Sequence, residues 1–145
     1  MLWLLLSLLL LVPYAVLLLL YRYWWSKQAL LQVPATFQPT TRFSILIPAR
    51  NEAENISACL QSIQQLNYPA HLFEVIVVDD FSDDTTVASA KQFAGVKVIE
   101  LKAILNEKIN SYKKKAIELG VEKATGNYIV TTDADCIVPV NWLRN

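Results

Sequence analysis

Val75-Ile76-Val77-Val78 is a short apolar run with no polar residue on either face, and Asp79-Asp80 follows it directly. Successive side chains of a strand point to opposite faces of a sheet, so a strand that is apolar throughout must be covered on both faces. Helices cover both faces of a parallel sheet, which makes such a run typical of a central parallel strand. The run therefore predicts an α/β fold with a mostly parallel sheet and flanking helices.

Strand and helix patterns alternate on both sides of this run. Apolar residues at helical spacing indicate a helix packed on the sheet, and the stripe comprises Ile56, Cys59, Leu60, Ile63 and Leu66. We expect strands over residues 43–47, 75–78, 96–101 and 128–131, helices over 51–66, 83–94 and 111–124, and a loop over 102–110. The order β-α-β-α-β-α-β implies parallel strands joined by right-handed crossovers.

Three polar loops follow strands of this sheet, over residues 48–52, 79–84 and 133–135. All the aspartates of the chain lie in two of these loops, at Asp79, Asp80, Asp83, Asp84, Asp133 and Asp135. Ligands of open parallel sheets bind beyond the carboxyl ends of the strands. We therefore expect segments that are distant in sequence to line one cleft at one edge of the sheet.

Asp133 and Asp135 follow the strand Tyr128-Ile129-Val130-Thr131 at i, i+2 spacing. On extended backbone this spacing places both carboxylates on one side of the chain. Carboxylate oxygens suit Mg²⁺ or Mn²⁺, and such a cation can neutralise a diphosphate leaving group. Asp79, at the end of a different strand, could accept hydrogen bonds from a base or a ribose. The alternative for the acidic pair is a solvated turn.

Basic residues near this edge could face a phosphate, and they include Arg50, Lys113 and Lys114. Three adjacent lysines on a helix cannot all face one way, and a solvated helix face remains the alternative for Lys113–Lys115. The loop after the first strand, Pro48-Ala49-Arg50-Asn51, holds no glycine, which argues against a dinucleotide or P-loop site. The formal net charge of +0 gives no reason to expect nucleic acid as a partner.

The N-terminal sequence predicts a membrane anchor. Residues 2–21 are apolar except for Ser7 and Pro13, and roughly 20 such residues span the hydrocarbon core. No Lys or Arg precedes the run and no Ala-x-Ala site follows it, which favours a retained helix over a cleaved signal. An aromatic cluster suited to the membrane interface ends the run and comprises Tyr21, Tyr23, Trp24 and Trp25.

Arg22 and Lys27 lie just beyond the apolar run, so the positive-inside tendency places the following domain in the cytoplasm. We therefore predict a single-pass protein of the cytoplasmic membrane. The expected parts are a transmembrane anchor over residues 1–25, a juxtamembrane linker over 26–41 and a globular part over 42–145. The two cysteines lack the spacing of a metal site or a disulfide framework.

Four motifs in order resemble the N-terminal part of a membrane-bound family 2 glycosyltransferase with the GT-A fold. Residues 43–52 resemble its first strand with Pro-x-x-Asn-Glu, and residues 74–85 resemble its Val-Asp-Asp-x-Ser-x-Asp-x-Thr element. Residues 113–120 and 133–135 resemble its lysine-rich helix and its Asp-x-Asp. Together the motifs span residues 43–138.

The resemblance implies transfer of a sugar from a nucleotide-diphosphate donor, expected to be a UDP-sugar, to a lipid or glycan acceptor, commonly with inversion. It implies Mg²⁺ or Mn²⁺ as the cofactor, with Asp135 and Asp133 as metal ligands. Asp79 would contact the base, Lys113 or Lys114 would lie near the diphosphate, and Asp133 would also contact the ribose or the sugar. The full set of residues expected at the nucleotide-sugar is Pro48, Ala49, Glu52, Asp79, Asp80, Lys113, Lys114 and Asp133.

Two departures from the family pattern matter. Tyr112 stands where the family often has glycine before its lysines, which leaves the assignment between Lys113 and Lys114 open. The acceptor-side half of the family, with its general-base carboxylate and often a Gln-x-x-Arg-Trp element, does not occur in these 145 residues. No catalytic base is therefore assigned, and we expect the chain alone to be inactive in sugar transfer.

Other functional classes fit the residues less well. A phospho-acceptor receiver domain needs an acidic pair after its first strand, where this chain has Pro48-Ala49-Arg50. A nucleotidyltransferase needs a glycine-rich, basic loop at the same place. The remaining alternative is a membrane-anchored nucleotide-binding or scaffold protein without catalytic activity.

Overall fold

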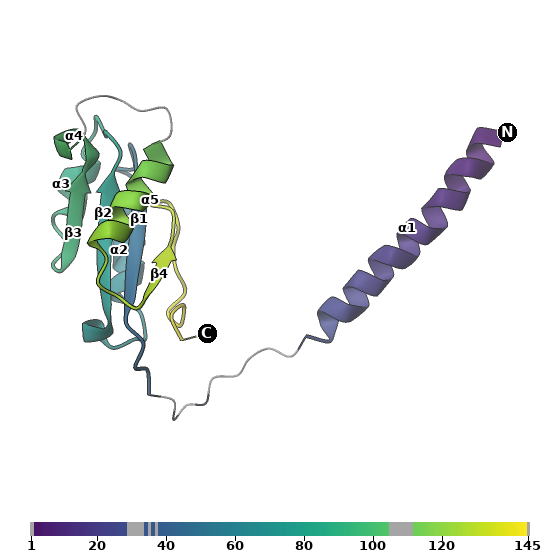
Figure 1. Cartoon of the computed structure of the whole chain (residues 1–145), viewed down its shortest axis with the longest axis horizontal. Helices are drawn as coiled ribbons and strands as arrows, with labels where there is room; N and C mark the ends of the chain where they lie inside the picture. Colours follow the sequence, from purple (N-terminus) through teal and green to yellow (C-terminus); the bar gives the residue numbers. More distant parts are fainter. Residues whose placement is uncertain (1, 29–33, 35, 37, 105–111, 145) are drawn as a thin grey trace. The chain divides into compact units, whose positions relative to one another are not determined.

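The structure is a computed structural model that describes residues 2–28, 34, 36, 38–104 and 112–144. The chain divides into two compact units, Met1–Gln32 and Val33–Asn145, which are treated separately below (Figure 1). The predicted linker over residues 26–41 and the predicted loop over residues 102–110 lie partly outside the described residues.

The first unit contains one helix, α1 (Leu2–Ser26). It ends one residue beyond the predicted anchor over residues 1–25 and carries the aromatic cluster on helical backbone. Its final turn is closed by the Ser26 hydroxyl, which donates to the Tyr23 carbonyl oxygen at 2.8 Å, and Lys27 Nζ lies 5.4 Å from the Tyr23 ring centre. By length and composition α1 could cross a membrane, with a mean hydropathy of 1.3 over Leu9–Ser26.

The second unit is built on a parallel sheet. Its four strands are β1 (Phe43–Ala49), β2 (Phe73–Asp79), β3 (Val96–Glu100) and β4 (Tyr128–Thr131), in the order β3-β2-β1-β4. All three strand pairings are parallel, and the register sets Ile45 opposite both Val75 and Val130. Residues 75–79 of β2 are buried throughout. The predicted α/β class with a mostly parallel sheet is therefore confirmed.

Helices cover both faces of this sheet (Figure 1). They are α2 (Ile56–Gln64), the 3-10 turn η1 (Ala70–Leu72), α3 (Thr86–Ala90), α4 (Leu101–Ile104) and α5 (Tyr112–Lys123). Ile45 packs with the α2 stripe and with Ala90 of α3 on one face. Leu46 packs with Leu101 of α4 and Leu119 of α5 on the other face. Alternating side chains of β1 thus enter two separate cores.

Several predicted bounds were wrong, and the largest error was at the start of α2. The helix begins at Ile56 instead of residue 51, because Asn51 has a left-handed backbone (φ 54°) that a helix cannot contain. The predicted helix over 83–94 shortens to Thr86–Ala90, because residues 82–84 are engaged in loop contacts described below. β1 continues through Pro48 to Ala49. Leu101 begins α4 where strand was expected, and α4 also occupies residues 102–104, where a loop was expected.

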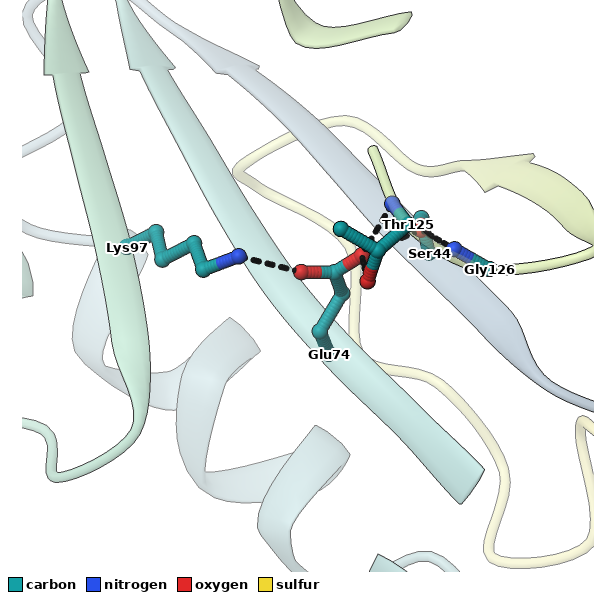
Figure 2. A network of polar contacts seen from close by, with 5 residues as sticks. All are labelled: Ser44, Glu74, Lys97, Thr125 and Gly126. Carbon is teal, nitrogen blue, oxygen red and sulfur yellow. Dashed lines mark hydrogen bonds and ion pairs between the residues drawn. The ribbon is translucent and has the colours of Figure 1, made fainter. Parts of the chain in front are cut away.

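A polar network ties the amino ends of the strands together, as Figure 2 shows. Glu74 of β2 is its centre: Oε1 accepts hydrogen bonds from Ser44 Oγ at 2.7 Å and from Thr125 N at 2.6 Å, and Oε2 from Lys97 Nζ at 2.6 Å. The Gly126 N–H closes the network by donating to Ser44 Oγ at 2.8 Å. We call these five residues the Glu74 network.

Burial of the Glu74 side chain, which is 10% exposed, opposes ionisation of its carboxyl group. The hydrogen bonds from Lys97, Ser44 and Thr125 outweigh that effect and lower the pKa of Glu74 to about 2. The Glu74 network therefore holds an ionised carboxylate among three strands and the segment that leads into the fourth.

Gly126 is required where this segment crosses β1. A Cβ atom at this position would lie 2.6 Å from two backbone atoms, Phe43 C and Ser44 N. Because backbone cannot yield as a side chain does, we expect Gly126→Ala to destabilise the fold by about 2 kcal/mol in thermal or urea unfolding.

Gly120→Ala in α5 is the matched control for Gly126→Ala. The three atoms nearest to the added methyl outside α5 would be side-chain atoms of Leu46 and Val78, at 3.1 Å or more. The better helix propensity of alanine offsets part of that crowding, so the change should stay within about 1 kcal/mol. Equal losses in the two variants would contradict the close approach at Gly126.

Candidate functional site

A cleft of about 330 Å³ lies at the carboxyl edge of the sheet. It is formed by the loops that follow β1, β2 and β4, and its lining residues are Pro48, Ala49, Arg50, Glu52, Asp80, Asp133 and Asp135. The structure thus brings together three segments that are widely separated in sequence. Of the described side chains that the sequence predicts for this site, those of Asp79 and Lys114 do not line the cleft.

Asp133 and Asp135 enter the cleft from a turn that follows β4, instead of from extended backbone. The Cys136 N–H donates to the Asp133 carbonyl oxygen at 3.2 Å and closes the turn, and the Cys59 thiol lies 3.8 Å from the same oxygen. Ala134, between the two aspartates, is buried in the core at 2% exposure. This anchor turns both carboxylates to the solvent side, where they face the cleft.

The donor set of this acidic turn suits a hard divalent cation. Its carboxylate oxygens are the ligands that Mg²⁺ and Mn²⁺ prefer. Among residues 2–28, 34, 36, 38–104 and 112–144, no group of three His, Cys, Asp or Glu side chains could hold a metal ion by itself. A cation on Asp133 and Asp135 would therefore take its other ligands from water or from a bound molecule.

Asp79 and Asp80 end β2 but occupy different environments. Asp79 is only 3% exposed; its Oδ2 accepts the Ser82 N–H at 3.2 Å, while its buried Oδ1 accepts no hydrogen bond from any described residue. Asp80 lines the cleft, and its Oδ2 lies 3.7 Å from Arg50 Nη1. The Asp80–Arg50 pair places one positive charge among the carboxylates of the cleft.

Lys114 and Lys115 of α5 do not line the cleft. Lys114 is exposed, and its Nζ lies 4.0 Å from Glu118 Oε1 on the same helix. Lys115 Nζ also contacts Glu118, at 3.2 Å. For Lys113 the structure describes only the helical backbone.

The sequence analysis missed a set of hydrogen bonds between the β1–α2 and β2–α3 loops. Asn51 contributes two of them: its N–H donates to Ser82 Oγ at 2.9 Å, and its Oδ1 accepts the Asp83 N–H at 2.9 Å. Donor and acceptor thus run in both directions between the two loops. Short polar side chains in two loops at the same sheet edge were the available sequence signal.

Two further bonds join the same loops. The Glu52 N–H donates to Thr86 Oγ1 at 2.8 Å, and the Ala53 N–H donates to Asp84 Oδ2 at 3.1 Å. Asp84 Oδ1 accepts both the N–H and the hydroxyl of Thr86. We call the four residues Asn51, Ser82, Asp84 and Thr86 the loop clasp.

Comparisons with known proteins agree on one family. A model of the family described as "Glycosyl transferase family 2" matches residues 44–145. Glycosyltransferase AglE of Haloferax volcanii is 36% identical over 70% of this chain and 33% of its own length. Dodecaprenyl-phosphate galacturonate synthase of Rhizobium johnstonii is 29% identical over 63% of this chain and 27% of its own length.

A solved structure gives the same result. Mannosyltransferase PcManGT from Pyrobaculum calidifontis, in complex with GDP-Man and Mn²⁺, superposes with a TM-score of 0.67 at 28% identity, over 85% of this chain and 36% of that one. The fold is therefore of the predicted GT-A type. The chain spans about a third of the length of the curated relatives that it matches.

Proposed function

The chain belongs to glycosyl transferase family 2, and from this premise we propose that it forms the donor-binding part of a glycosyltransferase. The observation that carries the proposal is the cleft at the carboxyl edge of the sheet, where one polar segment from each of three strands converges. Parallel sheets bind nucleotides at this edge. The wall of the cleft supplies several carboxylate groups and one guanidinium group.

The proposed donor is a nucleotide-diphosphate sugar, with UDP as the nucleotide. Pro48, Ala49 and Glu52 would border the nucleotide, and the uncompensated buried Oδ1 of Asp79 would accept a hydrogen bond from the base. Asp80 would also contact the nucleotide-sugar, and Lys113 or Lys114 would lie near the diphosphate. A mannosyltransferase of the same fold was solved with GDP-Man, which supports a nucleotide-sugar as the ligand class.

The proposed cofactor is Mg²⁺ or Mn²⁺, held by Asp135 and Asp133. The bound cation would neutralise charge on the diphosphate. Two carboxylates on an open turn leave coordination positions for phosphate oxygens, which is how such cations are commonly held beside nucleotides. The structure of that mannosyltransferase was solved in complex with Mn²⁺ as well as GDP-Man, which supports a divalent cation as the cofactor.

The proposed reaction transfers the sugar to a lipid or glycan acceptor with inversion at the sugar carbon. A polyprenyl-phosphate acceptor is consistent with the name of one relative, dodecaprenyl-phosphate galacturonate synthase. α1 would hold the domain at the cytoplasmic face of the membrane, where a lipid acceptor is within reach. The role of this chain is to bind and orient the donor, and no residue of it is assigned as the general base.

The test is UDP binding by the 145-residue chain in detergent, measured by calorimetry with and without Mn²⁺. Circular dichroism first establishes that the chain is folded. We expect Mn²⁺ to raise the affinity for UDP by about tenfold or more, roughly 1.4 kcal/mol. A folded chain that binds neither UDP nor GDP with either cation would contradict the proposal and favour a scaffold role.

A further inference from the structure

We propose that the loop clasp is a positioning device, in which Asn51, Ser82, Asp84 and Thr86 hold the β1–α2 and β2–α3 sides of the cleft in the positions that fit a nucleoside diphosphate. The inference rests on the proposed function for the identity of the ligand. The role it assigns to these four residues is to hold the backbone that carries the cleft residues, without contact to the ligand. The following observations support it.

The clasp joins the two loops in both directions. The β1–α2 loop donates from three successive backbone N–H groups, those of Asn51, Glu52 and Ala53. The β2–α3 loop donates back from the Asp83 N–H to Asn51 Oδ1. Neither loop can shift without breaking bonds to the other, so the two sides of the cleft that these loops form move as one unit.

Backbone strain lies at the same place. Asn51 and Phe81 have φ angles of 54° and 55°, a left-handed conformation that is costly for any residue with a Cβ atom and especially for a bulky one. Strained residues persist only where their surroundings determine the conformation, and such sites are often functional. Asn51 stands between the cleft residues Arg50 and Glu52, and Phe81 follows Asp80.

Phe81 is held from its other side by the core. Its side chain is 9% exposed and packs in the cluster that contains Leu101 and Leu46. Core packing therefore holds the Phe81 side chain, and the clasp holds the neighbouring residue Ser82. The direction in which Asp80 enters the cleft follows from these two constraints.

Both carboxylate oxygens of Asp84 accept hydrogen bonds within the clasp. Oδ1 accepts the N–H and the hydroxyl of Thr86, and Oδ2 accepts the Ala53 N–H. The hydrogen bonds from the Thr86 hydroxyl and N–H lower the pKa of Asp84, so its carboxylate is ionised when it accepts them. The acidic cluster that the sequence suggests is thus divided: Asp80, Asp133 and Asp135 face the cleft, and Asp84 holds the loops.

The test begins with Asn51→Gly in the 145-residue chain. Glycine keeps the left-handed backbone and removes Oδ1, so the variant breaks a clasp bond without adding strain. We expect faster amide hydrogen exchange in both residues 49–55 and residues 79–86, and UDP affinity lowered by about tenfold. Asn51→Asp retains an oxygen acceptor at the same place and should restore most of the affinity.

Ser44→Ala is the matched control, because it breaks the Glu74 network at the opposite ends of the same strands. It should lower the thermal midpoint of unfolding at least as much as Asn51→Gly and leave UDP affinity within about twofold of wild type. A loss of UDP affinity in Ser44→Ala equal to that in Asn51→Gly would show that general destabilisation, and not the clasp, governs binding.

Two other results would contradict the proposed role of the loop clasp without contradicting the proposed function. One is unchanged hydrogen exchange of residues 79–86 in Asn51→Gly, which is decisive whether or not UDP binds. The other is wild-type UDP affinity in that variant despite faster exchange in both loops. Failure of the wild-type chain to bind any nucleotide is a different outcome. It would contradict the proposed function, and with it the idea that the clasp positions residues for a nucleotide.

Discussion

Replacing Asp135 with alanine is expected to abolish the Mn²⁺-dependent part of UDP binding. Asp135 lines the cleft on a solvent-facing turn, and the Cys136 thiol lies 3.6 Å from its Oδ1. Because loss of an outer-shell partner already costs 10–100-fold in metal affinity, loss of a direct ligand should cost about 100-fold or more. Calorimetric titration of UDP at fixed Mn²⁺ measures the change, and little change in folding stability is expected.

Asp83→Ala is the matched control for Asp135→Ala. It removes the same charge from an exposed position at the same edge, and Asp83 does not line the cleft. Alanine keeps the backbone N–H that Asp83 donates to Asn51. We expect UDP affinity within about twofold of wild type, as for a screened surface charge. Mn²⁺-dependent binding that survives in Asp135→Ala would remove this residue from the metal site.

Glu74→Ala should strongly destabilise the second unit. It leaves the donors of Ser44, Thr125 and Lys97 without their shared acceptor at a position where the carboxylate is largely buried. Loss of one member of a buried, charged network costs about 3 kcal/mol. For a domain of this size that corresponds to a fall of roughly 10–15 °C in the thermal midpoint of unfolding.

The control is a second Glu–Lys pair of similar length that lies at the surface. Glu100 Oε1 is 2.7 Å from Lys91 Nζ, and both side chains are exposed. Glu100→Ala should cost less than about 1 kcal/mol, as exposed ion pairs do. A loss in Glu74→Ala no larger than that in Glu100→Ala would show that the Glu74 network adds no more than a surface pair.

The same carboxylate gives the fold a pH dependence. The pKa of Glu74 is lowered from 4.5 to about 2 in the folded chain, so the ionised form stabilises the fold above about pH 4.5. This stabilisation is lost as the pH falls from about 4.5 to about 2. After allowance for solvent screening of the partly exposed carboxylate, this contribution to the free energy of unfolding is on the order of 2 kcal/mol. Glu74→Gln should flatten this part of the curve of stability against pH.

Local patterns in the sequence were enough to predict the sheet and the position of the cleft. The apolar run at 75–78 indicated a central parallel strand, and the stripe from Ile56 to Leu66 indicated the helix packed beside it. Because parallel strands share a carboxyl edge, convergence of the three loops followed from topology. Periodicity and connectivity therefore sufficed for the parts of the fold that depend on core packing.

The loops could not be predicted in the same way. The start of α2 and the length of α3 depend on bonds such as Asn51 N–H to Ser82 Oγ, between residues 31 positions apart. Hydrophobic periodicity contains no information about such contacts. Glu74 was likewise unremarkable in sequence, because a charged residue at the start of a strand is normally solvated. Its importance depends on Ser44 and Thr125, which only the folded chain brings to it.

The position of β4 has a consequence for how the cleft operates. In the part of the chain that the structure describes, β4 is a four-residue strand at one end of the sheet and pairs with β1 alone. Short strands with one hydrogen-bonded neighbour open at low free energy, so the turn with Asp133 and Asp135 is carried by a part of the described sheet that can fray. A cation and a diphosphate that bind only the closed strand would pull this local equilibrium toward closure by mass action. Occupancy of the cleft and order at the sheet margin are therefore thermodynamically linked.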